Sequence, residues 1–137
     1  MTATVFKNAR LIDPEAGTDA RGDLAVQDGR IVDPASLTAA EVVDCGGKCL
    51  APGIVDIGCK VSEPGERHKE SFRSAGQAAA AGGVTTMVTR PDTTPAIDNP
   101  EVLEFVTRRA NEAAPVRVLP MAALTRGRSG REMVEIG

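Results

Sequence analysis

Aromatic and histidine residues are scarce in this 137-residue sequence, which contains three phenylalanines, no tyrosine, no tryptophan and one histidine. Proteins that bind single-stranded nucleic acids stack bases on aromatic side chains, and binding to a phosphate backbone needs clustered positive charge. This chain offers few aromatic side chains, and its formal net charge is -3. We therefore expect no nucleic-acid partner.

Long apolar runs are also missing. No segment approaches the roughly 18 consecutive apolar residues of a membrane-spanning helix, and the opening residues MTATVFKN lack the uninterrupted apolar stretch of a signal peptide. We expect no membrane association. The three cysteines, Cys45, Cys49 and Cys59, form no CxxC pair and are odd in number. Reduced thiols in a cytoplasmic protein are the simplest interpretation.

The overall composition is that of a globular protein, with 42% hydrophobic residues, which excludes a largely disordered chain. The length leaves room for one domain or for part of a larger one. Residues 1–50 are expected to form a small β unit of short strands. Within it, the Asp28-Gly29 turn predicts a tight hairpin because glycine tolerates positive φ, and Gly46-Gly47 predicts a second hairpin in the same manner.

Residues 51–137 alternate between strand and helix patterns. The predicted elements are a strand at 53–57, a helix from Phe72 to the stop at Gly82-Gly83, a strand at 84–89, a helix opened by Asn99-Pro100 and closed by Pro115, and a strand at 116–121. A capping box, Ser129-x-x-Glu132, predicts the start of a further helix. This alternation is typical of parallel βαβ units.

Three parallel strands cannot close a (β/α)₈ barrel, which needs eight strands and typically about 250 residues. We therefore interpret residues 51–137 as the first three βα units of an incomplete barrel. A compact three-stranded domain in its own right is the alternative. The capping box close to residue 137 weighs against that alternative.

Several segments resemble the dihydroorotase branch of the amidohydrolase superfamily. They are LAPGIVD at 50–56, EPG at 63–65, AAAAGGVTT at 78–86, PDTTPAIDN at 91–99 and LPMAALTRG at 119–127. The resemblance covers nearly the whole chain from Lys7. It implies an α/β fold, namely the first part of a (β/α)₈ TIM-type barrel preceded by a small β-sandwich unit.

In that family the first barrel strand ends in Asp-x-His-x-His, followed two residues later by Arg. The histidines hold zinc, which polarises the substrate carbonyl and lowers the pKa of a bound water towards about 7. The Arg, with an Asn at the end of the second strand, holds the substrate carboxylate. In the present sequence only Asp56 is retained. The replacements are Gly58 and Lys60 for the two histidines, Ser62 for the Arg and Asp92 for the Asn.

These replacements affect both metal and substrate binding. Glycine has no ligand atom, and the ammonium of Lys60 has no lone pair at neutral pH, so we expect no zinc at this position. Ser62 and Asp92 together predict a pocket that is neutral or repulsive towards carboxylates. Because Lys60 and Asp92 lie at the ends of adjacent strands, we also predict that the ammonium pairs with Asp92 in place of part of the metal charge.

Other candidate residues have plainer interpretations. Cys59 is expected to point away from the barrel mouth towards the helices, as a small buried residue. Cys45 and Cys49 lack two further ligands for structural zinc. The remaining candidates are expected to be solvated, and they are His68, Arg126-Gly127-Arg128 and Arg108-Arg109.

Two functions fit this sequence. The resemblance implies a dihydroorotase-like protein of pyrimidine biosynthesis that is non-catalytic, oligomeric and a scaffold or partner of aspartate carbamoyltransferase. The alternative is an active zinc-dependent cyclic amide hydrolase, in which later strands complete a reduced metal site.

Overall fold

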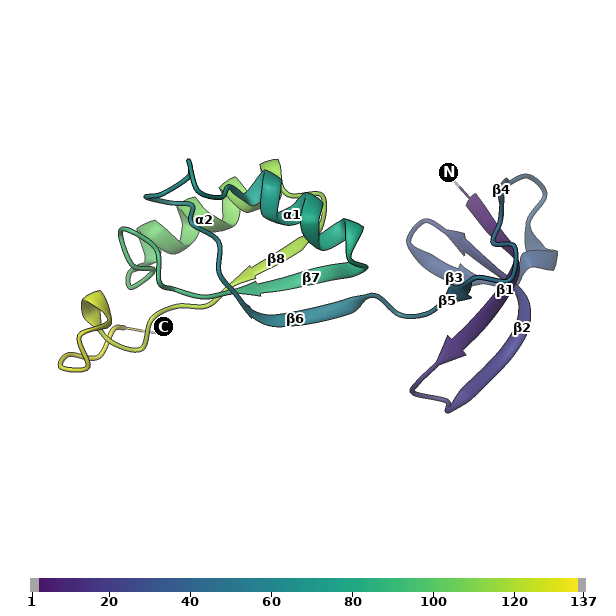
Figure 1. Ribbon diagram of the computed structural model, residues 1–137, viewed down its shortest axis with the longest axis horizontal. Coiled ribbons are helices and arrows are strands. Elements are labelled where there is room, and N and C mark those ends of the chain that lie inside the picture. The colour runs from purple at the N-terminus through teal and green to yellow at the C-terminus, as the bar shows by residue number, and fades with distance from the viewer. Residues whose placement is uncertain (1–2, 136–137) are drawn as a thin grey trace. The chain divides into compact units, whose positions relative to one another are not determined.

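The computed structural model describes residues 3–135, and the chain divides into two compact units, Met1–Pro52 and Gly53–Gly137. The division falls two residues after the boundary expected from the sequence. The first unit is built from strands and the second from alternating strands and helices (Figure 1).

The first unit contains one five-stranded sheet, and the predicted small β-sandwich unit is represented by this single sheet in the described residues. Its strands are β1 (Ala3–Asp13), β2 (Thr18–Gln27), β3 (Arg30–Val32), β4 (Glu41–Asp44) and β5 (Cys49–Leu50), with a short 3-10 helix at Pro34–Ser36 between β3 and β4. The predicted hairpin at Asp28-Gly29 is confirmed, because Gln27 of β2 pairs with Arg30 of β3 in antiparallel register.

The second predicted hairpin, at Gly46-Gly47, is wrong. β4 and β5 both pair in parallel with β1, through Thr4–Glu41 and Arg10–Cys49. The two glycines do adopt positive φ, but the Gly47 amide donates to the Asn8 carbonyl of β1 at 2.7 Å. The Gly46-Gly47 turn therefore bends the chain without reversing it, and β5 continues beside β1 in the same direction as β4.

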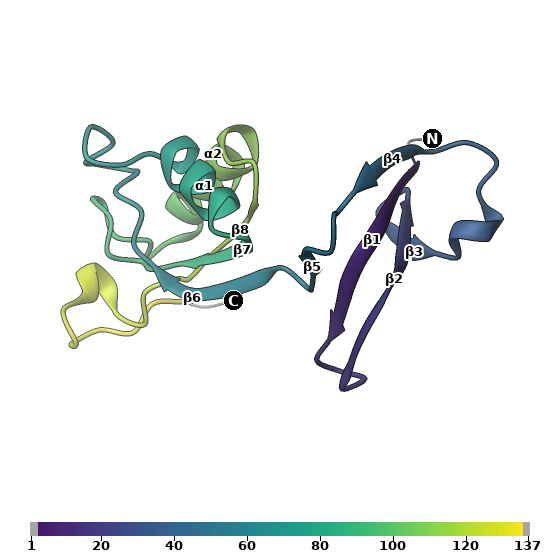
Figure 2. The ribbon, with the colours of Figure 1, turned by 45° about the vertical axis from the view of Figure 1, so that its right-hand side comes forward.

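The second unit contains a parallel sheet of three strands in the order β6-β7-β8. Its elements along the chain are β6 (Ile54–Cys59), α1 (Phe72–Ala81), β7 (Val84–Thr89), α2 (Pro100–Ala113) and β8 (Arg117–Pro120). Both helices cover the same face of the sheet (Figures 1 and 2). These three strands and two helices confirm the predicted strand–helix alternation.

Local sequence signals set the helix boundaries. The Ser71 side chain accepts from the Ser74 amide, and the Ser74 hydroxyl accepts from the Ser71 amide, which forms a capping box before α1. Asn99 accepts from the Val102 amide at 2.9 Å and caps α2. Pro100 occupies the first turn of α2, where no amide donor is missed.

The core of the second unit lies between the sheet and the two helices. It consists of the buried residues Val61, Phe72, Ala75, Met87, Ile97, Val106, Ala110 and Val118. Burying one large apolar side chain of this kind stabilises a fold by about 1.5–3 kcal/mol. The opposite face of the sheet is not covered in the same way, because Ile57 is 74% exposed and Leu119 is 40% exposed.

The further helix predicted from Ser129-x-x-Glu132 is wrong. In its place a 3-10 turn, Arg126–Arg128, is followed by a loop, so the third βα unit has its strand without its helix in the described residues. Arg128 has φ +58 and Gly130 has φ +74, a left-handed backbone that cannot continue a right-handed helix. The Glu132 carbonyl accepts from the Arg126 amide at 2.9 Å and closes this loop.

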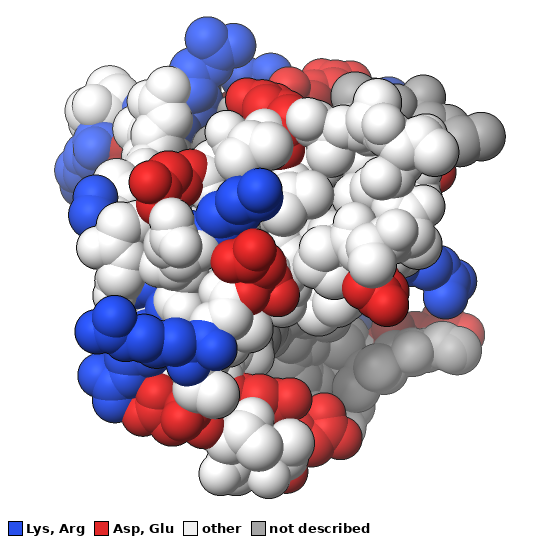
Figure 3. All heavy atoms as spheres, turned by 90° about the vertical axis from the view of Figure 1, so that its right-hand side faces the viewer, with Lys and Arg blue, Asp and Glu red and all other residues white. Residues whose placement is uncertain are grey.

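The surface is mixed in charge where it is drawn in Figure 3. Acidic and basic side chains are interspersed there among uncharged ones. Neither helix within residues 3–135 has the length and apolar character needed to cross a membrane.

Candidate functional site at the carboxyl ends of the barrel strands

The candidate site lies where β6 and β7 end. Lys60 follows β6 directly, and Asp92 follows β7 by three residues. The Nζ atom of Lys60 lies 3.3 Å from Oδ2 of Asp92. The predicted ion pair between these two side chains is therefore confirmed.

Two arginines join this pair. Nη2 of Arg90 lies 3.3 Å from Oδ2 of Asp92, and Nη1 of Arg128 lies 3.9 Å from the same oxygen. Three cations thus surround one carboxylate. The prediction of a pocket that is neutral or repulsive towards carboxylates does not agree with this excess of positive charge. Arg128 is 48% exposed, as its predicted solvation requires, and it also contacts Asp92.

Sequence reasoning missed Arg90 although a signal was available. Arg90 follows β7 directly, as Lys60 follows β6, and side chains at the ends of adjacent parallel strands are neighbours. The Arg90 amide donates to the Cys59 carbonyl at 2.9 Å and fixes this arrangement. For Arg128 no comparable signal exists, because a loop after β8 carries it back to Asp92.

Burial and the neighbouring positive charges act in opposite directions on the pKa of Asp92. Its side chain is only 11% exposed. Burial by itself acts to raise the pKa of Asp92, but the hydrogen bond from Lys60 and the charges of Arg90 and Lys60 outweigh it and hold the pKa below its usual value. The second carboxylate oxygen, Oδ1, is buried and has no hydrogen-bond partner among the described residues.

Gly58 interrupts the regular alternation of β6. The register with β7 shifts between Ile57 and Cys59, and Gly58 has φ +101. This is a β-bulge, in which one extra residue re-aims the side chains that follow it. Asp56 precedes the bulge and pairs with Met87, a core residue beneath the helices.

Cys59 packs against the helix-side core, as predicted. Its Sγ atom lies 3.5 Å from the Asp56 carbonyl oxygen. Burial raises the pKa of the Cys59 thiol, and a hydrogen bond and the negative charge of Asp56 raise it further. All three cysteines are free.

The residues at the strand ends do not fit a zinc centre of the expected kind. Gly58 supplies no ligand atom, and the Lys60 ammonium is engaged by Asp92. Within residues 3–135, no three His, Cys, Asp or Glu side chains are grouped to hold a metal ion. Ser62 is half-buried and His68 is exposed in the loop that follows, so neither brings a charged or imidazole group to the strand ends.

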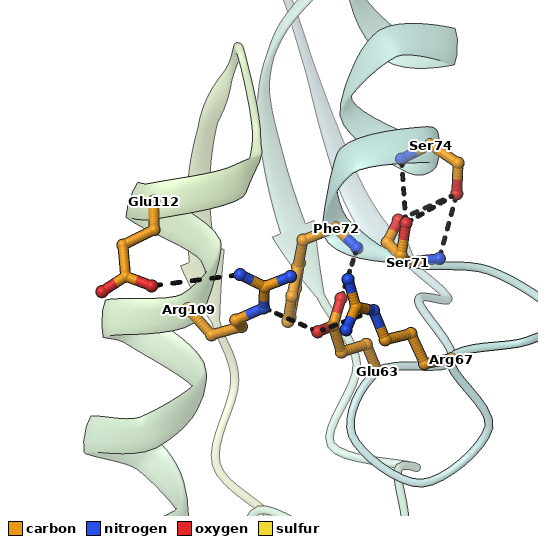
Figure 4. A network of polar contacts seen from close by, with 7 residues as sticks. All are labelled: Glu63, Arg67, Ser71, Phe72, Ser74, Arg109 and Glu112. Carbon is orange, nitrogen blue, oxygen red and sulfur yellow. Dashed lines mark hydrogen bonds and ion pairs between the residues drawn. The ribbon is translucent and has the colours of Figure 1, made fainter.

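A second polar cluster, centred on Glu63, lies between the first turn of α1 and Arg109 of α2 (Figure 4). Glu63 is 5% exposed. Its Oε1 accepts from Nε of Arg109 at 2.8 Å, and its Oε2 accepts from the Phe72 amide at 2.9 Å. Arg67 adds a longer contact, with Nε 3.6 Å from Oε1. The carboxylate therefore joins the loop after β6 to the first turn of α1 and to α2.

The cluster around Glu63 corrects the prediction that was made for Arg109. Arg109 is 27% exposed and bonded to Glu63, so the prediction that Arg109 is solvated is wrong, whereas Arg108 is exposed as predicted. Burial acts to raise the pKa of Glu63. The hydrogen bonds from Arg109 and Phe72 and the charges of Arg109 and Arg67 outweigh it, and the pKa lies below its usual value.

Gly65 brings the loops after β6 and β7 together. It has φ +102, and a Cβ atom there would lie 2.4 Å from the Thr94 carbonyl oxygen. Only glycine allows this close approach. In the Glu63-Pro64-Gly65 segment, the carboxylate of Glu63 thus bonds to both helices, and Gly65 packs closely against the loop after β7.

The sequence of this chain is similar to a known protein family and to several curated proteins. A family model described as dihydro-orotase-like matches residues 47–137. A dihydroorotase from Endomicrobium trichonymphae is 42% identical over 132 residues, which cover 96% of this chain and 31% of that protein. A dihydroorotase-like protein from Pseudomonas putida is 40% identical over 140 residues, covering 99% of this chain and 33% of that protein. The chain therefore spans about a third of the length of these curated relatives.

The fold is shared with solved structures. The L-hydantoinase (dihydropyrimidinase) from Arthrobacter aurescens superposes with a TM-score of 0.79 at 24% sequence identity, over 91% of this chain and 28% of that one. At this identity the likeness concerns the fold alone. It confirms that the second unit is the opening part of a TIM-type barrel and that a small β unit precedes it.

Proposed function

Because this chain belongs to the dihydroorotase-like family, we propose that the whole protein is a non-catalytic dihydroorotase homologue of pyrimidine biosynthesis. In this proposal it is a cytoplasmic, oligomeric protein that serves as a scaffold for aspartate carbamoyltransferase. The fold-bearing features of the family persist, while the residues of its chemistry are replaced. Fold and activity are separable in this way because activity depends on a few side chains grafted on a shared scaffold.

One observation carries the proposal. The Lys60 ammonium stands where the resemblance places a zinc-binding histidine, and it lies 3.3 Å from Asp92. A protonated amine paired with a carboxylate offers no lone pair to a metal and repels a cation. The positive charge of the Lys60 ammonium thus replaces part of the positive charge of the zinc, which the family uses to polarise a carbonyl.

The backbone at Gly58 supports the same conclusion. At φ +101, a histidine would be strained. The first ligand position is therefore altered in its backbone as well as in its side chain. Replacement of this one residue alone would not rebuild the ligand pair of the family.

Zinc content and turnover test the proposal. We expect the purified full-length protein to contain far less than one zinc per chain by elemental analysis, with an active dihydroorotase prepared in parallel as the positive control. We also expect no conversion of dihydroorotate above the rate without protein. Stoichiometric zinc together with turnover would disprove the non-catalytic assignment.

The partnership needs its own measurement. We expect the full-length protein and the aspartate carbamoyltransferase of the same organism to elute together in size-exclusion chromatography. Separate elution of the two proteins at micromolar concentration would remove the scaffold role and leave the question of catalysis untouched.

The second candidate is an active zinc-dependent cyclic amide hydrolase with a reduced metal site. The observation that favours it is the 42% identity to a protein named dihydroorotase, of which this chain covers only 31%. Ligands from later strands would then hold a single zinc. The zinc and turnover measurements separate this candidate from the scaffold.

A further inference from the structure

We propose that the strand ends of the second unit form a binding site for a phosphate group, made by Lys60, Arg90 and Arg128 around Asp92. The assignment is independent of whether the whole protein turns over dihydroorotate. It rests on charge, on free donor groups and on the way the backbone holds the cations together.

The site has an excess of positive charge. Three cationic side chains lie within 3.3–3.9 Å of a single carboxylate oxygen. The hydrogen bond and charge of Lys69 lower the pKa of Glu66, and the charge of Lys60 adds a smaller lowering, so the Glu66 carboxylate is engaged mainly by Lys69. Among residues 3–135, two positive charges at the strand ends therefore have no carboxylate of their own, which suits an ion that carries two negative charges.

The donors needed to hold such an ion are available. Each guanidinium carries five N–H donors in a planar fork. Within residues 3–135 only one nitrogen each of Arg90 and Arg128 contacts Asp92, and no hydrogen bond uses their other side-chain nitrogens. The side chains of Lys60, Arg90 and Arg128 are 57%, 53% and 48% exposed, so a ligand can reach them from solvent.

The backbone brings the cations to one place. Arg90 is fixed to β6 by the hydrogen bond to the Cys59 carbonyl. The loop that carries Arg128 is tethered to the loop before α2, because the Gly127 amide donates to Oδ2 of Asp98 at 2.7 Å. The cluster is thus partly organised before any ligand arrives, which lowers the entropic cost of binding.

Asp92 has a second part in this site. Its Oδ1 atom is buried and lacks a hydrogen-bond donor among the described residues, whereas Oδ2 gathers the cations. Asp92 therefore holds the three cations together and does not itself contact the bound phosphate, because Oδ1 is closed to solvent and Oδ2 already faces the cations. A phosphate group near neutral pH carries about 1.5–2 negative charges, which matches the two unpartnered positive charges.

Isothermal titration of the full chain with inorganic phosphate at low ionic strength tests the assignment. We expect saturable one-to-one binding, weakened about tenfold by Arg90→Gln and by Arg128→Gln, because a charge-assisted hydrogen bond contributes on the order of one such factor. Arg108→Gln removes an exposed arginine from α2, which is outside the cluster, and should leave the affinity unchanged. Unchanged melting curves would show that the variants are folded.

Two further readouts make the outcome decisive. In ¹H–¹⁵N spectra, the side-chain Nε–H signals of Arg90 and Arg128 should shift on adding phosphate, and that of Arg108 should not. Succinate, a carboxylate dianion, should bind several-fold more weakly than phosphate. Absence of phosphate binding, an equal loss in Arg108→Gln, or equal affinity for succinate would overturn the proposal.

Discussion

Glu63 and Asp92 are two largely buried carboxylates in the loops that follow adjacent strands, and they are used in opposite ways. Both oxygens of Glu63 accept hydrogen bonds, from Arg109 and from the Phe72 amide. In Asp92 one oxygen faces three cations and the other has no partner among the described residues. A satisfied carboxylate holds a structure together, whereas an unsatisfied one beside excess cations leaves interactions for a ligand.

The largest effect is expected from Glu63→Gln. The substitution removes the charge that pairs with Arg109 and weakens the contacts to α1 and α2, so we expect a loss of about 2–4 kcal/mol in the free energy of unfolding. Urea denaturation measures it. Glu66→Gln is the matched control, because Glu66 lies in the same loop and pairs with an exposed lysine, and it should cost less than about 1 kcal/mol. Equal losses of unfolding free energy in the two variants would show that the buried Glu63 stabilises the fold no more than the exposed Glu66 does.

Lowering the pH should protonate Glu63 and weaken the same contacts to Arg109 and the Phe72 amide. The pKa of Glu63 is lowered in the folded chain, so its ionised form stabilises the fold above the unfolded pKa of about 4.3. That stabilisation is lost as the pH falls through the lowered folded pKa. We expect thermal melting from pH 7 down to about pH 3 to show a steeper fall for the wild type than for Glu63→Gln. Parallel curves would mean that Glu63 does not contribute to acid unfolding.

Gly58→Ala probes the bulge that precedes the Asp92 cluster. A side chain at φ +101 is expected to cost about 1–2 kcal/mol. Gly82→Ala is the control, since Gly82 has φ -87 and a Cβ there would have no contact shorter than 3.5 Å. Chemical denaturation of both variants should show the loss at residue 58 alone. A neutral Gly58→Ala would show that the bulge does not require glycine.

Lys60→Gln should have the smallest effect on stability. The ion pair is 57% exposed on the lysine side, and exposed pairs contribute roughly 0–1 kcal/mol. The two arginines also stay beside Asp92 after the substitution. Denaturation should therefore give a change below about 1 kcal/mol. A loss as large as that of Glu63→Gln would show that Asp92, like Glu63, is needed to hold the fold together.

Much of the second unit could be predicted because its signals are local. The Ser71 and Asn99 caps, the Gly82 stop and the β-branched run of β7 all act within a few residues of where they lie in the chain. The pairing of Lys60 with Asp92 was also predictable, because the residues that follow the ends of adjacent parallel strands meet at the same edge of the sheet. Hydrophobic patterning, capping and strand alternation need no knowledge of distant contacts.

The sequence by itself thus determined the three strands and two helices of the second unit, and its resemblance to the family led to the prediction that the zinc-binding residues are replaced. Only the tertiary structure decided that Glu63 pairs with Arg109, 46 residues away, that Gly58 forms a bulge, and that Arg128 returns to Asp92. Capping and periodicity operate over one or two turns of chain. Contacts between distant residues depend on how loops and helices pack, and the sequence pattern carries no direct signal of that packing.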